Sequence, residues 1–247
     1  MKLLRLLILL ILTPIIMNAQ QFEKDTIKSK KRNGQDIHIT FIKHGSLMFE
    51  YAGQVLYVDP VCEYCDFDTM PKADYILVTH DHYDHFDLKA IKALKKPSTK
   101  IVANQLVIDV LREGVALENN QEISLSQTIH VLSFPAYNTT KGREKFHPKK
   151  INNGYVITID GTKIYVAGDT EFIKEMKKLK DKIDIAFLPV NQPYTMSVEQ
   201  AEEAVKTIKP KIFYPYHYGQ TEQVTPINDL QQILQDFPVE IRIRDLE

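Results

Sequence analysis

The chain has 247 residues, of which 44% are hydrophobic and 26% charged, so it is long enough to bury a sizeable core. This composition excludes a collagen-like or mainly disordered chain, and the presence of only 2 cysteines excludes a small scaffold built on disulfides. With 31 Lys and Arg against 32 Asp and Glu, the net charge of −1 gives no reason to expect binding to nucleic acid or to an anionic membrane.

The first residues have the three-part pattern of a secretory signal peptide. Lys2 and Arg5 form a positive end, Leu6–Ile16 is a largely apolar run, and Ala19 is a small residue suited to cleavage. A membrane span needs about 20 apolar residues, so this run is too short for a comfortable span, although an uncleaved anchor is the alternative. We therefore expect residues 1–19 to be a signal peptide and the protein to be secreted or periplasmic.

The remaining chain is predicted to form one domain after a short leader. Residues 20–34 are polar and rich in lysine, which predicts a flexible leader before a single domain over 35–247. In the first half we expect strands at Ile37–Lys43, Leu47–Tyr51, Val55–Val58, Tyr75–Val78, Ile101–Ala103 and Thr128–Phe134, and helices at Leu88–Leu94 and Gln105–Arg112. In the second half we expect strands at Tyr155–Ile159, Lys163–Ala167, Ile183–Leu188, Lys211–Tyr214 and Val239–Ile243, and helices at Thr170–Leu179, Ser197–Ile208 and near Pro226–Leu234. Two β-rich halves, each followed by helices, predict an α/β fold in which two packed sheets carry helices on both outer faces.

The two cysteines lie close together in the segment Cys62-Glu63-Tyr64-Cys65. In an oxidising compartment they would close a small disulfide, and otherwise they are idle thiols. No thioredoxin-like strand and helix surround them, and one pair of cysteines cannot by itself complete a tetrahedral zinc site.

One cluster of histidines carries the chemistry. After the predicted strand Tyr75–Val78, the sequence continues Thr-His-Asp-His-Tyr-Asp-His. His80 and His82 lie on the same side of an extended segment, so both imidazoles can reach one metal. Asp84 and His85, at the turn into the next helix, can face a second metal. Imidazole nitrogen and carboxylate oxygen are suitable ligands for zinc, iron or manganese.

A closed site needs further ligands, and two candidates stand at the ends of predicted strands. Asp169 lies in Ala-Gly-Asp-Thr, and His217 lies in Tyr-Pro-Tyr-His. Alone, either residue would be an ordinary structural group, but beside the H-x-H-x-D-H cluster both are predicted to be metal ligands.

The order of these motifs resembles the metallo-β-lactamase superfamily over roughly His38 to Arg244. The segments Lys-His-Gly-Ser at 43–46, Val-Asp-Pro at 58–60 and Leu-Pro-Val-Asn-Gln-Pro-Tyr-Thr-Met at 188–196 look most like the lactonase-like branch typified by ascorbate-6-phosphate lactonase. The resemblance implies a four-layer αββα sandwich with metals at one edge between the sheets. It also implies a set of ligands: His80 and His82 for the first metal, Asp84, His85 and His217 for the second, and Asp169 as a bridge between them.

One position departs from the family pattern. The family usually supplies a further histidine to the first metal from the strand end before Gly-Asp, where this chain has Tyr137. Either His147 folds back from the loop 139–153 as the missing ligand, or Tyr137 itself approaches the metal, although a phenol with a pKa of about 10 is the poorer ligand. Two zinc ions are the expectation, with a single ion, or manganese or iron, as the alternatives.

Such a site would hydrolyse a small molecule. A metal-bound hydroxide would attack an ester, lactone, amide or phosphoester, and Asp84 would orient that nucleophile and pass a proton to the leaving group. Tyr137, Asn138 and Tyr194 are candidates for binding the substrate. His44 either points into the opening of the same metal site or is a hydrogen-bonded structural residue.

Three questions stay open at this stage. A basic loop either attracts a phosphate or carboxylate or is simply solvated, and it comprises Lys141, Arg143, Lys145, Lys149 and Lys150. A nuclease of the same superfamily and a non-catalytic metal-binding module are the alternative functions. We expect a small-molecule substrate, no nucleic acid and no stable membrane span, and the oligomeric state is open.

Overall fold

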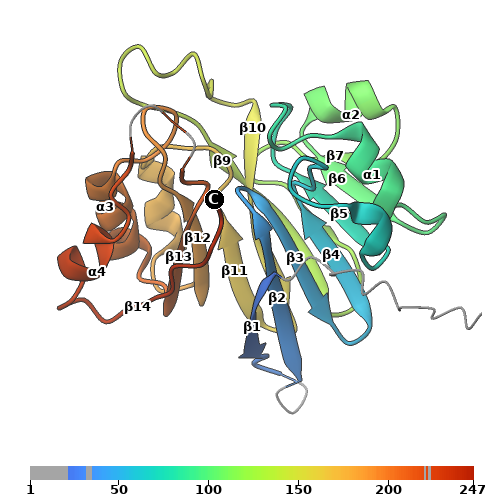
Figure 1. Cartoon of the computed structure of the whole chain (residues 1–247), viewed down its shortest axis with the longest axis horizontal. Helices are drawn as coiled ribbons and strands as arrows, with labels where there is room; N and C mark the ends of the chain where they lie inside the picture. Colours follow the sequence, from blue (N-terminus) through green and yellow to red (C-terminus); the bar gives the residue numbers. More distant parts are fainter. Residues whose placement is uncertain (1–21, 32–34, 220, 222–223) are drawn as a thin grey trace, which may run out of the picture.

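Two mixed β-sheets of seven strands each form the centre of the protein in the computed structural model, which describes residues 22–31, 35–219, 221 and 224–247 (Figure 1). The strands of the first sheet follow the chain in order: β1 (Glu23–Lys28), β2 (Asp36–Lys43), β3 (Ser46–Tyr51), β4 (Gln54–Val58), β5 (Tyr75–Val78), β6 (Lys100–Ala103) and β7 (Val115–Ala116). The second sheet also follows chain order: β8 (Glu122–Ser124), β9 (Ile129–Ala136), β10 (Asn152–Ile159), β11 (Thr162–Val166), β12 (Ile185–Pro189), β13 (Ile212–Tyr216) and β14 (Glu240–Ile241).

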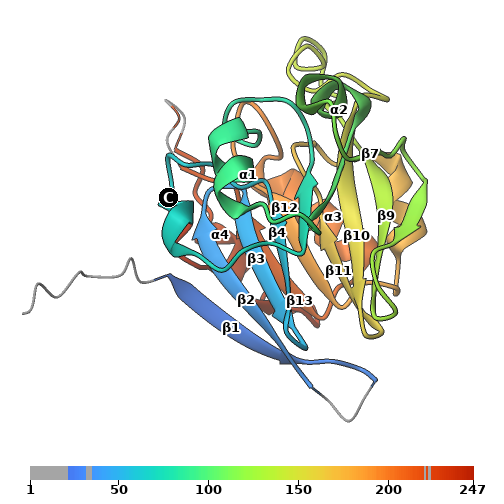
Figure 2. The ribbon, with the colours of Figure 1, turned by 90° about the vertical axis from the view of Figure 1, so that its right-hand side faces the viewer.

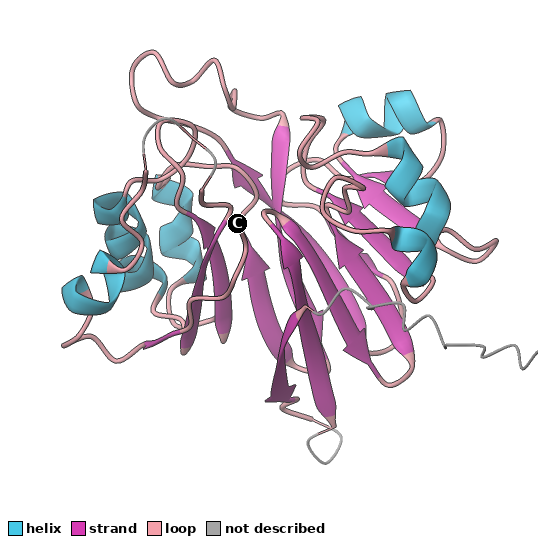
Figure 3. Cartoon of the chain, in the orientation of Figure 1, coloured by secondary structure: helices cyan, strands magenta, loops and turns pink. Residues whose placement is uncertain are grey.

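Helices cover the outer face of each sheet. The α-helices are α1 (Leu88–Leu94), α2 (Gln105–Leu111), α3 (Val198–Ile208) and α4 (Asp229–Ile233), and the 3-10 helices are η2 (Phe67–Thr69) and η3 (Lys174–Leu179). In Figure 3, α1 and α2 lie outside the first sheet, and α3 and α4 lie outside the second. The predicted four-layer αββα sandwich is therefore confirmed. Among the described residues, no helix is long and apolar enough to cross a membrane.

The direction of the strands decides where a site can form. Each sheet pairs its antiparallel strands first, β1 to β4 or β8 to β11, and continues with parallel strands, β4 to β7 or β11 to β14. Parallel strands bring their carboxyl ends to one edge of a sheet, which is where open α/β sheets bind their ligands. The loops after β5, β11 and β13 are the segments that the sequence analysis singled out.

Aromatic side chains from both sheets fill the space between them. Phe41 of the first sheet lies 5.1 Å from Tyr214 of the second, and Phe49 lies 6.1 Å from Phe187, measured between ring centroids. All four rings are almost fully buried, and burial of each stabilises the fold by about 1.5–3 kcal/mol relative to exposure. This packing fixes the two sheets, and with them the loops at their edge, relative to each other.

Two N-terminal caps explain why the helices α1 and α3 begin where they do. The Asp87 carboxylate accepts a hydrogen bond from the backbone of Lys89 at the start of α1. Ser197 and Gln200 form a capping box at the start of α3, in which each side chain bonds the other residue's backbone N–H. Both helices begin where the sequence predicts.

The structure corrects two predicted elements. The flexible leader expected over 20–34 is wrong for Glu23–Lys28, because these residues form β1, which pairs with β2 along the outer edge of the sheet (Figure 2). The helix expected over Thr170–Leu179 is reduced to η3, because the Thr170 hydroxyl bonds the Tyr137 carbonyl and holds its segment outside the helix. The short strands β7 and β8 were not predicted. The predicted signal peptide lies outside the described residues.

Asp25 fastens β1 to the end of the chain. Its carboxylate accepts hydrogen bonds from Tyr214, from Arg242 at 3.1 Å and from Arg244 at 2.8 and 2.9 Å. Burial alone would raise the pKa of Asp25, but the hydrogen bonds from Tyr214 and Arg244 bring it below its ordinary value. The ionised form of Asp25 is therefore more favourable in the folded protein than in the unfolded chain, so the ionised carboxylate stabilises the fold.

We predict that Asp25→Asn lowers the free energy of unfolding by about 1–3 kcal/mol at pH 7. The contribution of the carboxylate is complete above about pH 4 and is lost as the pH falls through the lower folded-state pKa, so the two proteins should converge in acid. Urea unfolding at several pH values measures this. Glu202→Gln, which removes the ion-pair partner of the exposed Lys206, is the control and should change stability by less than about 0.5 kcal/mol. An Asp25→Asn protein as stable as the parent at pH 7 would contradict the assignment.

Candidate metal centre

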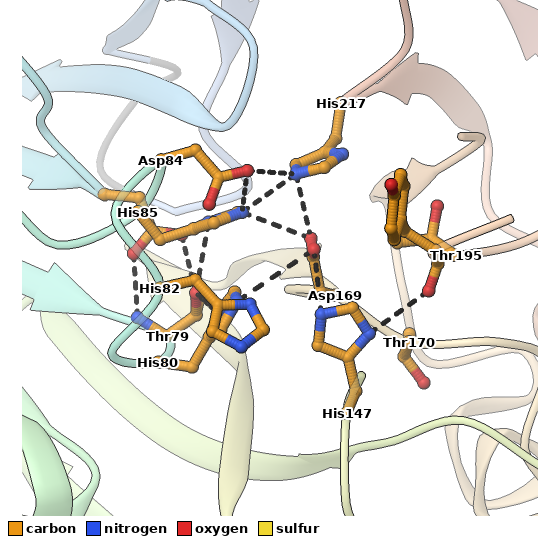
Figure 4. Close-up of polar contacts among 12 residues, drawn as sticks. Thr79, His80, His82, Asp84, His85, His147, Asp169, Thr170, Thr195 and His217 are labelled. Atoms are coloured by element: carbon orange, nitrogen blue, oxygen red, sulfur yellow. Dashed lines mark hydrogen bonds and ion pairs between the residues drawn. The ribbon is translucent and has the colours of Figure 1, made fainter. Parts of the chain in front are cut away.

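Six of the eight histidines and two aspartates converge at one edge of the sandwich. Figure 4 labels all of them except His44. They form two groups, and within each group the potential ligand atoms all lie within 4.8 Å of one another. The first group is His80, His82, His147 and Asp169, and the second is His44, Asp84, His85 and His217. The seven residues that the sequence predicted as metal ligands all lie in these two groups.

The strand ends explain how distant residues meet. The segment 79–85 follows β5, Asp169 follows β11, and His217 follows β13, each at a carboxyl end. His44 lies in the turn between β2 and β3, and His147 lies in the long loop between β9 and β10. The first sheet thus supplies the motif of clustered histidines, and the second sheet supplies the aspartate and the late histidine.

Asp169 stands between the two groups. Its Oδ1 lies 3.3 Å from His85 Nε2 and 3.2 Å from His217 Nε2, while its Oδ2 lies 3.2 Å from His147 Nε2 and 4.0 Å from His80 Nε2. Burial alone would raise the pKa of Asp169, but the charges of His217 and His85 hold it well below its ordinary value. One carboxylate oxygen therefore faces each group, which is the geometry of a bridging ligand.

A buried carboxylate orients the imidazoles from behind. Asp59 Oδ2 accepts a hydrogen bond from His85 Nδ1 at 2.8 Å and another from the Thr79 hydroxyl at 2.7 Å. That hydroxyl in turn accepts from His80 Nδ1 at 2.9 Å, a proton assignment that follows from the partners of each atom. Both rings then turn their Nε2 lone pairs toward the ligand groups, as supporting contacts do in metal sites.

The donor set fits a cation because lone pairs face lone pairs. His147 Nδ1 bonds the Tyr194 carbonyl at 3.1 Å, so the buried Nε2 carries a lone pair and has no hydrogen-bond partner. Its near neighbour Asp169 Oδ2 is also an acceptor. In the second group, His85 Nε2 and His217 Nε2 lie 2.9 Å apart. Such contacts are unfavourable unless a proton or a metal ion joins them, and imidazole and carboxylate ligands suit zinc.

Asp84 and His44 meet at the open side of the second group. His44 Nε2 bonds Asp84 Oδ2 at 3.2 Å, and its ring centroid is 3.7 Å from that of His217. Burial, together with the charge of His217, lowers the pKa of His44 to about 4, so its ring is neutral at pH 7. Sequence analysis left the place of His44 open, because a single histidine before a glycine has no ligand spacing of its own.

The structure places two of the predicted substrate-binding residues, Tyr137 and Asn138, outside the lining of the cavity above the metal centre. Tyr137 donates its hydroxyl to Glu175 at 2.8 Å, and Asn138 donates its side-chain amide to the Tyr194 carbonyl at 2.7 Å. Both side chains are buried among these partners and neither lines the cavity above the metal centre. Tyr194, the third candidate, does line that cavity, whose volume is about 860 Å³.

The fold and this site define a metal-dependent hydrolase. The β-lactamase superfamily domain matches residues 38–217, so the chain belongs to the metallo-β-lactamase superfamily, as its motifs suggested. A metal-dependent hydrolase of Nanoarchaeum equitans is 31% identical over 187 residues, which cover 73% of this chain and 83% of that protein.

Solved structures agree with this assignment. A provisionally assigned metal-dependent hydrolase of Parabacteroides distasonis is 51% identical, with a TM-score of 0.87, and the match covers 92% of this chain and 100% of that one. A metallo hydrolase of Ignicoccus hospitalis is 21% identical with a TM-score of 0.71 over 85% of this chain and 95% of that one, so it supports the fold alone.

The relatives correct the expectation of export. They include proteins of the archaea Pyrococcus furiosus and Thermoplasma acidophilum as well as Nanoarchaeum equitans, and one of Staphylococcus carnosus. Nothing in these comparisons indicates a signal peptide or secretion. The interpretation of the protein as secreted or periplasmic is therefore not retained.

We predict that Asp59→Asn weakens metal binding by about 10–100-fold, because His85 and Thr79 lose the carboxylate that orients them. Competition with a chromophoric chelator measures the affinity. Asp160→Asn, at the turn between β10 and β11, is the control and should leave the affinity unchanged. An unchanged affinity in Asp59→Asn would contradict the orienting role of this carboxylate.

Proposed function

We propose that the protein is a two-zinc hydrolase of small molecules. The observation that carries this proposal is the placement of Asp169, whose two carboxylate oxygens face different ligand groups. Two zinc ions at these groups would supply an activated water nucleophile at neutral pH and would polarise the substrate oxygen. The reaction class is hydrolysis of an ester, lactone, amide or phosphoester.

The ligands divide between the two ions. His80, His82 and His147 would hold the first, and Asp84, His85 and His217 would hold the second. Asp169 would bridge both. The geometry supports His147 over Tyr137 as the replacement for the usual family histidine, because His147 Nε2 lies 3.2 Å from Asp169 while the Tyr137 hydroxyl bonds Glu175.

Asp84 is the proposed proton carrier. Its carboxylate lines the cavity and lies 3.5 Å from His217 Nε2. Burial alone would raise the pKa of Asp84, but hydrogen bonds from His217 and His44 hold it well below its ordinary value, so the group is an anion at pH 7. It can accept a hydrogen bond from the attacking water and then pass the proton to the leaving group, with His44 fixing its orientation.

The metal content of the full-length protein tests this proposal. We predict two zinc ions per chain in the parent and about one in His147→Ala, because the first group loses a neutral nitrogen ligand. Tyr137→Phe should keep both ions, since the Tyr137 hydroxyl bonds Glu175. Elemental analysis of protein purified without chelators gives the count and would also identify manganese or iron.

His130→Ala is the matched control, because His130 is exposed on β9 and bonds Ser124 far from the two groups. It should leave both ions in place. Loss of one ion in Tyr137→Phe, with two retained in His147→Ala, would contradict the ligand assignment. A parent protein without bound metal would contradict the proposed function itself.

A further inference from the structure

The mouth of the cavity above the metal centre has a distinct chemistry. Its floor is formed by the proposed ligands, and its rim by loops that follow β4, β5, β9 and β12. Aromatic rings line that rim at Tyr64, Tyr83, Phe146 and Tyr194. Tyr83 is 82% exposed, so its ring adds almost nothing to the core and is available to a ligand.

The charged groups of the rim are all acidic. Beyond the proposed ligands Asp84 and Asp169, the cavity is lined by the carboxylates of Glu63 and Asp81, both on exposed residues. Among the described residues, no lysine or arginine lines it. At the rim, apart from the ions proposed for the floor, the carboxylates of Glu63 and Asp81 favour ligand groups of the opposite charge.

The lysines and the arginine of the loop 139–153 do not line the cavity, and three of them contact other groups. Arg143 lies 3.7 Å from Glu171, and Lys149 lies 3.6 Å from Glu175 and over the Tyr137 ring. Lys145 packs on the Phe146 ring, 5.1 Å from its centroid, without lining the cavity. The cavity therefore has no cationic clamp for a phosphate or carboxylate among its described lining residues.

We infer that this hydrolase selects substrates that place an apolar or aromatic group, either uncharged or cationic, at the mouth of the cavity. It rejects substrates that carry a phosphate or carboxylate there. This inference rests on the proposed function and narrows its substrate class. Ring faces attract cations and pack on apolar groups, and the two rim carboxylates add attraction for a cation and repulsion for an anion. A volume of about 860 Å³ suits a small molecule.

Three metal-directed probes of similar size test the selection. The probes are three benzohydroxamates, which bind metal through the hydroxamate and direct the 4-position of the ring toward the mouth of the cavity. They differ only in the substituent at that position, which is trimethylammonio, tert-butyl or carboxylate. We expect the zinc-loaded full-length protein to bind the trimethylammonio probe about tenfold more tightly than the carboxylate probe at low salt, with tert-butyl between them. Titration calorimetry measures the three dissociation constants, and added salt should shrink the ratio.

The double variant Glu63→Gln and Asp81→Asn should reduce that ratio to about twofold without changing the zinc content. The double variant Glu202→Gln and Glu240→Gln removes two carboxylates outside the cavity lining and should keep the full ratio. Equal affinity for the three probes, or a preference for the carboxylate, would overturn the inference. A ratio unchanged by the rim variant would overturn its assignment to Glu63 and Asp81.

Hydrolysis of matched esters separates selection from catalysis. The 4-nitrophenyl esters of butyrate, 4-(trimethylammonio)butyrate and glutarate differ in charge at the end of the acyl chain. We expect kcat/KM for the anionic glutarate ester to be at least about fivefold below the other two. Failure to hydrolyse any of them, with the probe ranking intact, would count against ester hydrolysis while supporting the selection. Failure of all probes to bind the zinc-loaded protein would overturn both.

Discussion

The buried carboxylate of Asp169 makes contacts on which both ligand groups depend. A buried anion is costly unless opposite charge or hydrogen bonds compensate it, and here the surrounding groups are imidazoles from both sheets. His85 comes from the first sheet and His217 from the second, so the distance between them is set by the packing of the sheets. Contacts such as that between Phe41 and Tyr214 therefore serve the site as well as the stability of the fold.

The backbone around the site is held in costly conformations. His44, Asp59 and His217 all have positive φ angles, of 52°, 46° and 53°. Such left-handed residues other than glycine cost about 1–3 kcal/mol each and persist where surrounding contacts impose them. Gly45 lies next to this strained turn, and a Cβ atom there would come within 2.9 Å of the His85 ring. The local backbone is thus shaped to place side chains at the metal centre.

Local patterns predicted most of the fold and singled out most of the candidate ligands that the structure brings together. The H-x-H-x-D-H segment carries its spacing within six residues, and Asp169 and His217 are marked by the strands before them, so neighbours in sequence suffice. His147 could be named only as one of two options, because its position depends on the course of a long loop. The sequence alone does not show which side Tyr137 and Asn138 face at the strand end, because partners such as Glu175 decide it. Strand β1 was missed because an edge strand held by Asp25 has little apolar alternation.

A crystal structure of the zinc-loaded protein, with anomalous diffraction recorded on both sides of the zinc absorption edge, tests the central claim most directly. The account predicts two anomalous peaks that flank Asp169, one among His80, His82 and His147 and the other among Asp84, His85 and His217. A single peak, or a first-site ion bound by Tyr137 with His147 turned away, would contradict it.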